Sequence, residues 1–138
     1  MSESVSVIYT FDPNTAEVTL LLEKHGLNPI EIIPAFPALS LGEWAVTFNL
    51  QAGTGVSNPV FDETNGIVLG TLPSGLTPSN PQRLNDTQWQ VTLTNAVSAL
   101  AEVDYDINGT ATEGSFFKAR VVRDPAIILT PDPPPPSN

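Results

Sequence analysis

The sequence predicts an all-β fold, an antiparallel β-sandwich of about 7–9 strands. The first observation behind this prediction is that apolar and polar residues alternate with a period of two in several runs along the chain. Such a run places an apolar row on one face and a polar row on the other, as a half-buried antiparallel strand requires. The second observation is that turn-forming residues separate these runs. The third is length: 138 residues with 41% apolar residues suffice for one domain with its own core.

The strands are expected in the following order along the chain. Alternation is clearest in five runs: residues 5–11, 18–22, 44–50, 89–93 and 103–107. Shorter apolar segments predict further strands at residues 60–61, 67–69, 116–122 and 126–130. The turn signals between them are Asp12-Pro13-Asn14, Asn65-Gly66, Pro73-Ser74-Gly75, Asn80-Pro81 and Asn108-Gly109.

One short helical crossover is expected near residues 95–102. Asn95 is a favourable N-cap residue, and Ala96, Ala99 and Leu100 favour a helix of about two turns. A helical connection before a strand that carries Tyr105 resembles the pattern of immunoglobulin-like folds in general terms. The hallmark cysteines of that fold are absent, so the resemblance implies only an immunoglobulin-like sandwich and no particular family.

The C-terminal end differs from the rest in composition. We expect residues 1–130 to form the sandwich domain and residues 131–138, which are rich in proline, to form a disordered or polyproline II tail. Proline has no backbone N–H, so this segment cannot donate to a strand ladder. It is best interpreted as a solvated end or a stiff spacer.

Composition excludes several classes of function. The formal net charge of −10 disfavours nucleic acid and anionic membrane surfaces as partners. The absence of cysteine excludes zinc–cysteine sites and thiol chemistry, and the one histidine, His25, lies in a polar, turn-like context without a nucleophile motif. We therefore expect no enzyme activity. The sequence from Met1 has neither a basic start nor a long apolar segment, which predicts a cytoplasmic protein.

The segment from Asp104 to Gly109 contains the one candidate metal site. Its spacing matches the Asp-x-Asp-x-Asn-Gly opening of a calcium loop, and the candidate ligands are Asp104, Asp106, Asn108 and Glu113. The twelfth loop position, where a bidentate glutamate belongs, is Ser115. The alternative is a strand whose outer face carries the two aspartates in cross-strand ion pairs, with position 106 opposite Lys118 and 104 opposite Arg120. We favour the ion pairs, and expect no cofactor.

Two tryptophans begin similar segments, Trp44-Ala-Val-Thr-Phe and Trp89-Gln-Val-Thr-Leu. Both are in phase with apolar rows, so we expect both to be buried. The similarity is compatible with a duplication, but any two central strands of a sandwich favour these residue types. We favour the second interpretation.

The sequence therefore predicts a non-catalytic binding or structural module that acts through protein–protein interaction, with self-association into a homo-oligomer included. The alternative is a calcium-dependent or carbohydrate-binding domain that uses residues 104–108.

Overall fold

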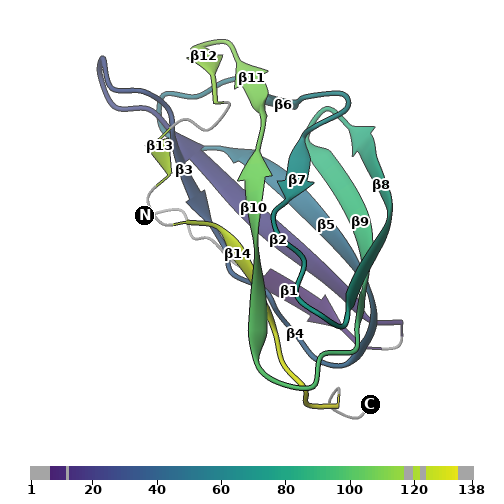
Figure 1. Cartoon of the computed structure of the whole chain (residues 1–138). Helices are drawn as coiled ribbons and strands as arrows, with labels where there is room; N and C mark the ends of the chain where they lie inside the picture. The colour runs from purple at the N-terminus through teal and green to yellow at the C-terminus, as the bar shows by residue number, and fades with distance from the viewer. Residues whose placement is uncertain (1–6, 12, 117–119, 122–123, 134–138) are drawn as a thin grey trace.

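The computed structural model describes residues 7–11, 13–116, 120–121 and 124–133, which contain fourteen β-strands and no helix (Figure 1). The all-β prediction is confirmed, and the sheets are consistent with a β-sandwich. The described residues form fourteen strands, several of them only two or three residues long, where about 7–9 strands were predicted. Within the described residues, no helical segment has the length and apolar character that crossing a bilayer requires.

In chain order the strands are β1 (Val7–Thr10), β2 (Thr15–Glu23), β3 (Glu31–Pro34), β4 (Ala38–Leu39), β5 (Gly42–Ala52), β6 (Val60–Phe61), β7 (Ile67–Leu69), β8 (Leu76–Asn85), β9 (Gln88–Asn95), β10 (Ala101–Ile107), β11 (Gly109–Ala111), β12 (Gly114–Ser115), β13 (Arg120–Val121) and β14 (Ala126–Leu129).

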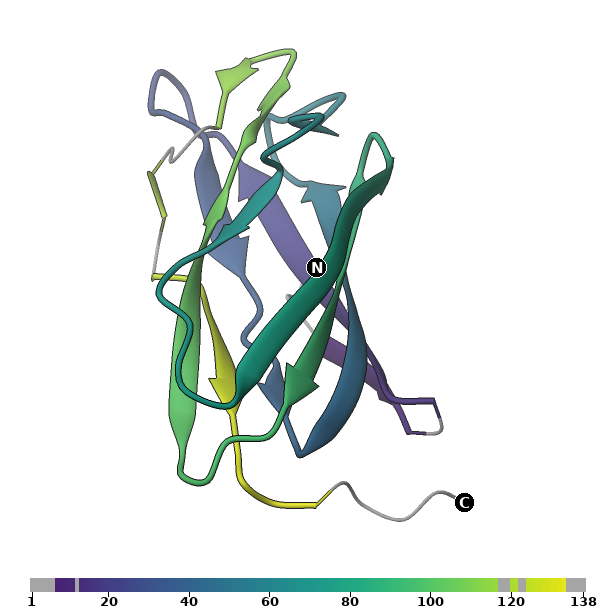
Figure 2. The ribbon, with the colours of Figure 1, turned by 45° about the vertical axis from the view of Figure 1, so that its right-hand side comes forward.

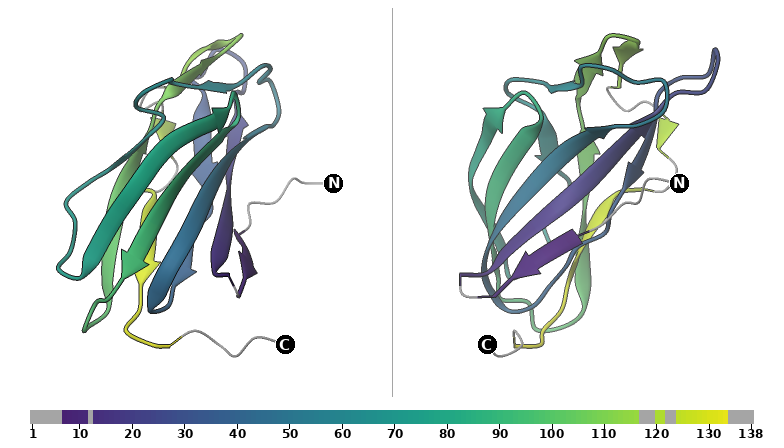
Figure 3. Two further views of the ribbon diagram at one scale, coloured as in Figure 1. Left: turned by 90° about the vertical axis from the view of Figure 1, so that its right-hand side faces the viewer. Right: turned by 180° about the vertical axis from the view of Figure 1, so that it is seen from behind.

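The large sheet has the order β13-β3-β2-β5-β9-β8, and β1 also pairs with β2. β1 lies opposite residues 15–18 of β2 and β3 lies opposite residues 20–23, so these two strands share one edge of β2 (Figure 3). β5 occupies the other edge in parallel orientation, with Thr15 opposite Ala45. The expectation of a purely antiparallel sandwich is therefore wrong. The segment from residue 24 to 41 is long enough to carry the chain back for a parallel pairing.

A second sheet, β4-β14-β10-β7, lies on one side of the large sheet (Figure 1). β10 is its central strand, and it pairs with β14 through residues 101–104 and with β7 through residues 105–107. The prediction of a final strand in the segment after Asp124-Pro125 is confirmed by β14. A small third sheet, β12-β11-β6, lies at the upper end together with the β8–β9 turn (Figure 2). The strand order does not support the more specific immunoglobulin-like pattern.

The core lies between the large sheet and the second sheet, where the predicted apolar rows meet. In β5 and β9 the inward positions are buried and the outward positions are mostly polar, so the alternation identified in the sequence is confirmed. Trp44 is 1% exposed and Trp89 is 4% exposed, as expected. From the opposite sheet, Tyr105, Ile127 and Leu129 are buried in the same cluster.

The predicted helical crossover near residues 95–102 is wrong, and the contacts of Asn95 explain why. Its Oδ1 accepts from the Val97 backbone N–H at 3.1 Å, which is a cap-like bond. The Ala96 N–H donates to the Gly75 carbonyl at 2.8 Å. β9 continues to Asn95 and β10 begins at Ala101, so the connection is too short for a helix of two turns. The buried Asn95 Nδ2 donates to the carbonyl oxygens of Leu39, Ser40 and Thr130. Asn95 thus joins three chain segments where a helix was expected.

The turn expected at Asn80-Pro81 is also wrong, because both residues lie inside β8. Asn80 has a φ of +50°, and the pairing of β8 with β9 shifts its register between Ser79 and Gln82. The residues that signal a turn therefore form a bulge in an edge strand, where a proline does not interrupt a central ladder.

Of the predicted tail, the structure describes residues 131–133, and residues 134–138 lie outside the described part of the chain. The Asp132 carbonyl accepts a hydrogen bond from the Leu41 backbone N–H at 2.8 Å. The chain is therefore still held against the segment before β5 at this point.

Candidate functional site

The two predicted aspartate ligands lie on β10. Asp104 is exposed and lies opposite Ala126 of β14, and Asp106 is half-buried and lies opposite Val68 of β7. The predicted position of Asp104 opposite Arg120 is wrong, because Arg120 lies opposite Glu31 of β3 in the large sheet. Lys118 lies outside the described residues, so the position of Asp106 opposite Lys118 stays a prediction. The error arose because β10 finds its partners in β14 and β7, and not in the segment that follows it directly.

The other two predicted ligands are committed to different contacts. The Glu113 carboxylate accepts from the backbone N–H and from the hydroxyl of Ser57, both at 2.7 Å, and these bonds lower the pKa of Glu113. Asn108 is 5% exposed, and its Nδ2 donates to the Asn65 carbonyl at 2.5 Å. Its Oδ1 is buried without a hydrogen-bond partner among the described residues. That part of the chain contains no group of three or more His, Asp or Glu side chains arranged to hold a metal ion. Calcium binding stays a prediction.

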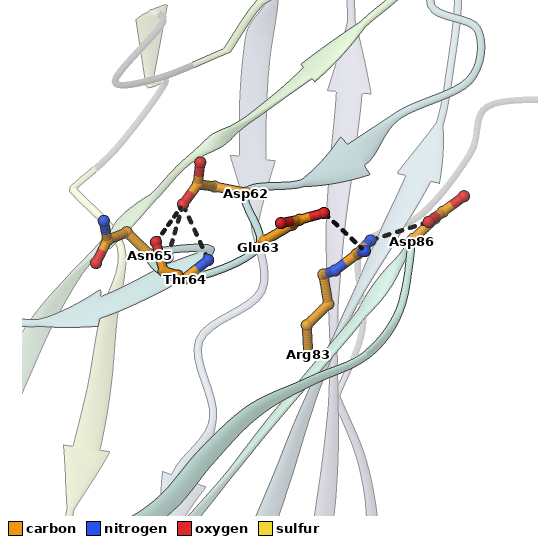
Figure 4. Close-up of polar contacts among 6 residues, drawn as sticks. All are labelled: Asp62, Glu63, Thr64, Asn65, Arg83 and Asp86. Carbon is orange, nitrogen blue, oxygen red and sulfur yellow. Dashed lines mark hydrogen bonds and ion pairs between the residues drawn. The ribbon is translucent and has the colours of Figure 1, made fainter.

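The loop between β6 and β7 is held in a fixed turn by Asp62 (Figure 4). Its Oδ2 accepts from the backbone N–H of Asn65 at 2.7 Å, from that of Thr64 at 3.1 Å and from the Thr64 hydroxyl at 3.2 Å. The two backbone donors hold the pKa of the Asp62 carboxyl below its usual value. Asp62 thus acts as a structural acceptor, since its carboxylate organises the turn that leads into β7.

Arg83 connects this loop to the β8–β9 hairpin (Figure 4). Its guanidinium lies 2.9 Å from the Asp86 carboxylate and 4.0 Å from that of Glu63. Because both carboxylates are exposed, the two ion pairs contribute only about 0–1 kcal/mol each. A stronger backbone connection runs beside them, from the Phe61 N–H to the Asp86 carbonyl at 2.7 Å. The loop and the hairpin are therefore fixed relative to each other.

An apolar pocket of about 300 Å³ lies next to this loop, between the edge strands of the two sheets. Its apolar lining comes from β7, β8 and β9: Ile67, Val68, Leu69, Pro78, Pro81 and Val91. Trp89 also lines the pocket, and the polar contribution comes from Thr64 and Asn65. The volume is at the lower end of the range for small-molecule sites.

The indole of Trp89 contains an unsatisfied donor. Its Nε1 is buried and has no hydrogen-bond partner among the described residues. Trp44, by contrast, donates from Nε1 to the Ser40 carbonyl at 2.9 Å. The sequence predicted that both rings are buried but contained no signal for this difference. On the other side of the same ring, the missing side chain of Gly66 lets the turn approach: a Cβ there would lie 2.6 Å from Cε3.

The strand edges form a second candidate site. Within the described chain, β1 pairs only with β2, so its outer edge offers unpaired backbone groups. The strand contains no charge and no proline, and its Ile8 is 61% exposed. The Tyr9 hydroxyl accepts from the Ala38 N–H at 2.9 Å and so fixes this edge to the segment that contains β4.

Comparison with known proteins assigns the chain to no family, because no protein-family model matches it and no curated protein matches it significantly.

Proposed function

We propose that the protein is a non-catalytic binding module that acts through protein–protein interaction at the outer edge of β1, with self-association included. The observation that carries this proposal is the open edge of β1, with its exposed Ile8. An unpaired strand edge is a template for a further strand, whose backbone supplies the missing hydrogen bonds.

The contrast with the opposite edge of the large sheet supports this choice. The edge strand there, β8, contains Pro78 and Pro81 and an irregular register, and these features discourage the addition of another strand. β1 is built from β-branched and aromatic residues, which favour pairing. The side chain of His25 is 54% exposed in the turn after β2, with its Nε2 3.6 Å from Glu23. An imidazole that is open to water and near one carboxylate is typical of a surface histidine.

Sedimentation equilibrium with a matched pair of variants tests the proposal. Ile8→Lys places a charge on the β1 edge, and Leu27→Lys places the same charge on a fully exposed leucine in the β2–β3 turn. We expect the wild type and Leu27→Lys to self-associate and Ile8→Lys to remain monomeric. Because each copy has a net charge of −10, association should strengthen as salt is added. If the wild type is a strict monomer at high concentration, self-association is contradicted. If both variants associate equally, the β1 edge is not the interface.

A second candidate function is calcium-dependent or carbohydrate binding near residues 104–108. The observation that favours it is that Asn108 lines a pocket of about 310 Å³ together with Asp62 and Glu63, while its buried Oδ1 has no hydrogen-bond partner among the described residues. A ligand specific to the native state raises the melting temperature by mass action. A higher melting temperature in millimolar calcium, or with a neutral disaccharide, would support this candidate. An unchanged melting temperature with both would contradict it.

A further inference from the structure

We infer that the partner at the β1 edge is a second copy of this chain, and that the two β1 strands pair antiparallel about a two-fold axis with Ile8 directly opposite the second copy's Ile8. The inference rests on the proposed function and deepens it, because it names the partner and fixes the register. β1, which lies beside β2 in Figure 3, then joins the large sheets of the two copies into one.

Ile8 is the apolar end of a polar row on the outer face of the large sheet. The residues in register with it across the sheet are Glu17 of β2, Thr47 of β5 and Gln90 of β9. Ile8 ends this row at the open edge, where it is 61% exposed. Because the row offers Ile8 no apolar neighbour within its own sheet, an apolar side chain across the edge is the contact that would remove it from water.

The alternation of β1 restricts the register. A two-fold axis perpendicular to the sheet keeps each face on the same side in both copies, so an outward residue must lie opposite an outward residue. Ile8 and Thr10 are exposed on the outer face, whereas Val7 and Tyr9 pack against the core. Within this strand, Ile8 can therefore lie opposite Ile8 or opposite Thr10. The first register places two exposed aliphatic side chains in contact. The second leaves each Ile8 against a hydroxyl and places Tyr9, whose ring already packs on Trp44, opposite its own copy.

The charges near the edge are compatible with a second copy as the partner. β1 contains no charged side chain, and Glu17 lies one strand inside the edge. In the dimer the Glu17 carboxylates of the two copies are separated by both β1 strands, which is three strand spacings or about 14 Å. This separation exceeds the Debye length of about 8 Å at physiological salt, so their repulsion is largely screened. The edge is thus neutral and complementary to itself.

The test is disulfide trapping, because the chain contains no cysteine. In Ile8→Cys the paired Cα atoms would lie about 4.5–5.5 Å apart, within the range of a disulfide. Diamide is the oxidant and takes up the two electrons and two protons that the thiols lose. Thr10→Cys is the matched control on the same face of β1, since its two copies would be offset by four residues, or about 13 Å.

We expect Ile8→Cys to form the cross-linked dimer more than about tenfold faster than Thr10→Cys, because a thiol held opposite its partner experiences a high effective concentration. The two variants should react at the same rate in denaturing urea. An excess of cysteine-free wild type should slow the cross-linking of Ile8→Cys by occupying the same edge, and an excess of Ile8→Lys should not.

Sedimentation equilibrium separates this inference from the proposed function. If the wild type associates and Ile8→Lys does not, but the two cysteine variants cross-link equally fast, the register is wrong and the β1 edge remains the interface. Faster cross-linking in a mixture of Ile8→Cys and Thr10→Cys than in either alone would assign the shifted register and also overturn the inference. If the wild type is a strict monomer and Ile8→Cys reacts no faster than Thr10→Cys, a second copy is not the partner, and only binding of a different protein remains of the proposed function.

Discussion

Trp44 and Trp89 occupy equivalent positions in neighbouring strands of the large sheet, yet their surroundings differ. Because β5 and β9 are antiparallel, Trp44 lies opposite Leu93 and Trp89 lies opposite Phe48, which places the two indoles at opposite ends of the core. Trp44 is enclosed by the rings of Tyr9 and Phe11, with centroids 6.1 and 5.8 Å away, and its donor is satisfied.

Around Trp89 the enclosure is incomplete. The Phe61 ring lies 6.2 Å away, Gly66 contacts the indole face, and the remaining space is the apolar pocket. A similar local sequence is therefore sufficient to bury both indole rings. Whether the indole N–H is satisfied depends on segments that are distant in sequence, such as the one that contains Ser40.

The largest loss of stability is expected when either indole is truncated. Trp44→Ala and Trp89→Ala should each cost about 3–5 kcal/mol of unfolding free energy, because each leaves a large cavity in the core. The loss should be greater for Trp44, whose hydrogen bond to Ser40 is also removed. Urea denaturation measures both values. A greater loss at Trp89 would contradict the difference in enclosure.

A substitution at Gly66 tests the contact of the turn with Trp89. In Gly66→Ala the new Cβ would lie 2.6 Å from Trp89 Cε3 and 2.9 Å from Phe61 Cδ1, so the rings must move. Overpacking of this kind should cost about 1–3 kcal/mol. Gly70→Ala is the control, since its nearest contact would be 3.2 Å, and it should cost less in the same denaturation experiment. Equal costs would show that the turn is not packed tightly on the indole.

Replacing either tryptophan by phenylalanine keeps a ring and removes the indole N–H, so it tests hydrogen bonding apart from most of the packing. Trp44→Phe breaks the bond to the Ser40 carbonyl, whereas Trp89→Phe removes a donor that has no partner among the described residues. We expect Trp44→Phe to be more destabilising than Trp89→Phe by about 1 kcal/mol. Thermal and urea unfolding of the two variants provide the comparison, and a reversed order would mean that the Trp89 N–H is satisfied in solution.

The smallest effect is expected on the outer face of β9. Thr92 is half-buried and points away from the core that Trp89 and Val91 enter. Thr92→Ala should therefore change the unfolding free energy by no more than about 0.5 kcal/mol. A loss as large as that of Trp89→Ala would refute the alternation on which the sandwich interpretation depends.

The sequence predicted the strands well where alternation is strong. Trp44, Val46 and Phe48 are buried as their phase required, and the apolar run in β14 is a strand of the second sheet. These features depend on residues close together in the chain, which is why the sequence reveals them.

The failures concern contacts with other segments of the chain. Asn95 is a good helix cap in isolation, but its amide binds three backbone carbonyls of other segments. Asn80-Pro81 is a turn signal by composition, but pairing with β9 extends it into a bulged strand. Asp104 was predicted opposite Arg120, whereas it lies opposite Ala126 of β14. The pocket beside Trp89 depends on packing across two sheets, for which no local pattern exists.

The parallel pairing of β2 with β5 has a consequence for how fast the protein folds. Residue 15 must find residue 45, and the register continues to the pairing of 22 with 52, so no tight hairpin can nucleate the centre of the large sheet. Closing this loop lowers the conformational entropy of the chain before any compensating interaction forms. Hydrogen bonds and apolar burial between β2 and β5 follow only after closure. A high contact order of this kind predicts refolding in milliseconds to seconds, and not in microseconds, after dilution from denaturant. Stopped-flow fluorescence of the Trp89→Phe variant, in which Trp44 of β5 is the one remaining tryptophan, should follow this step.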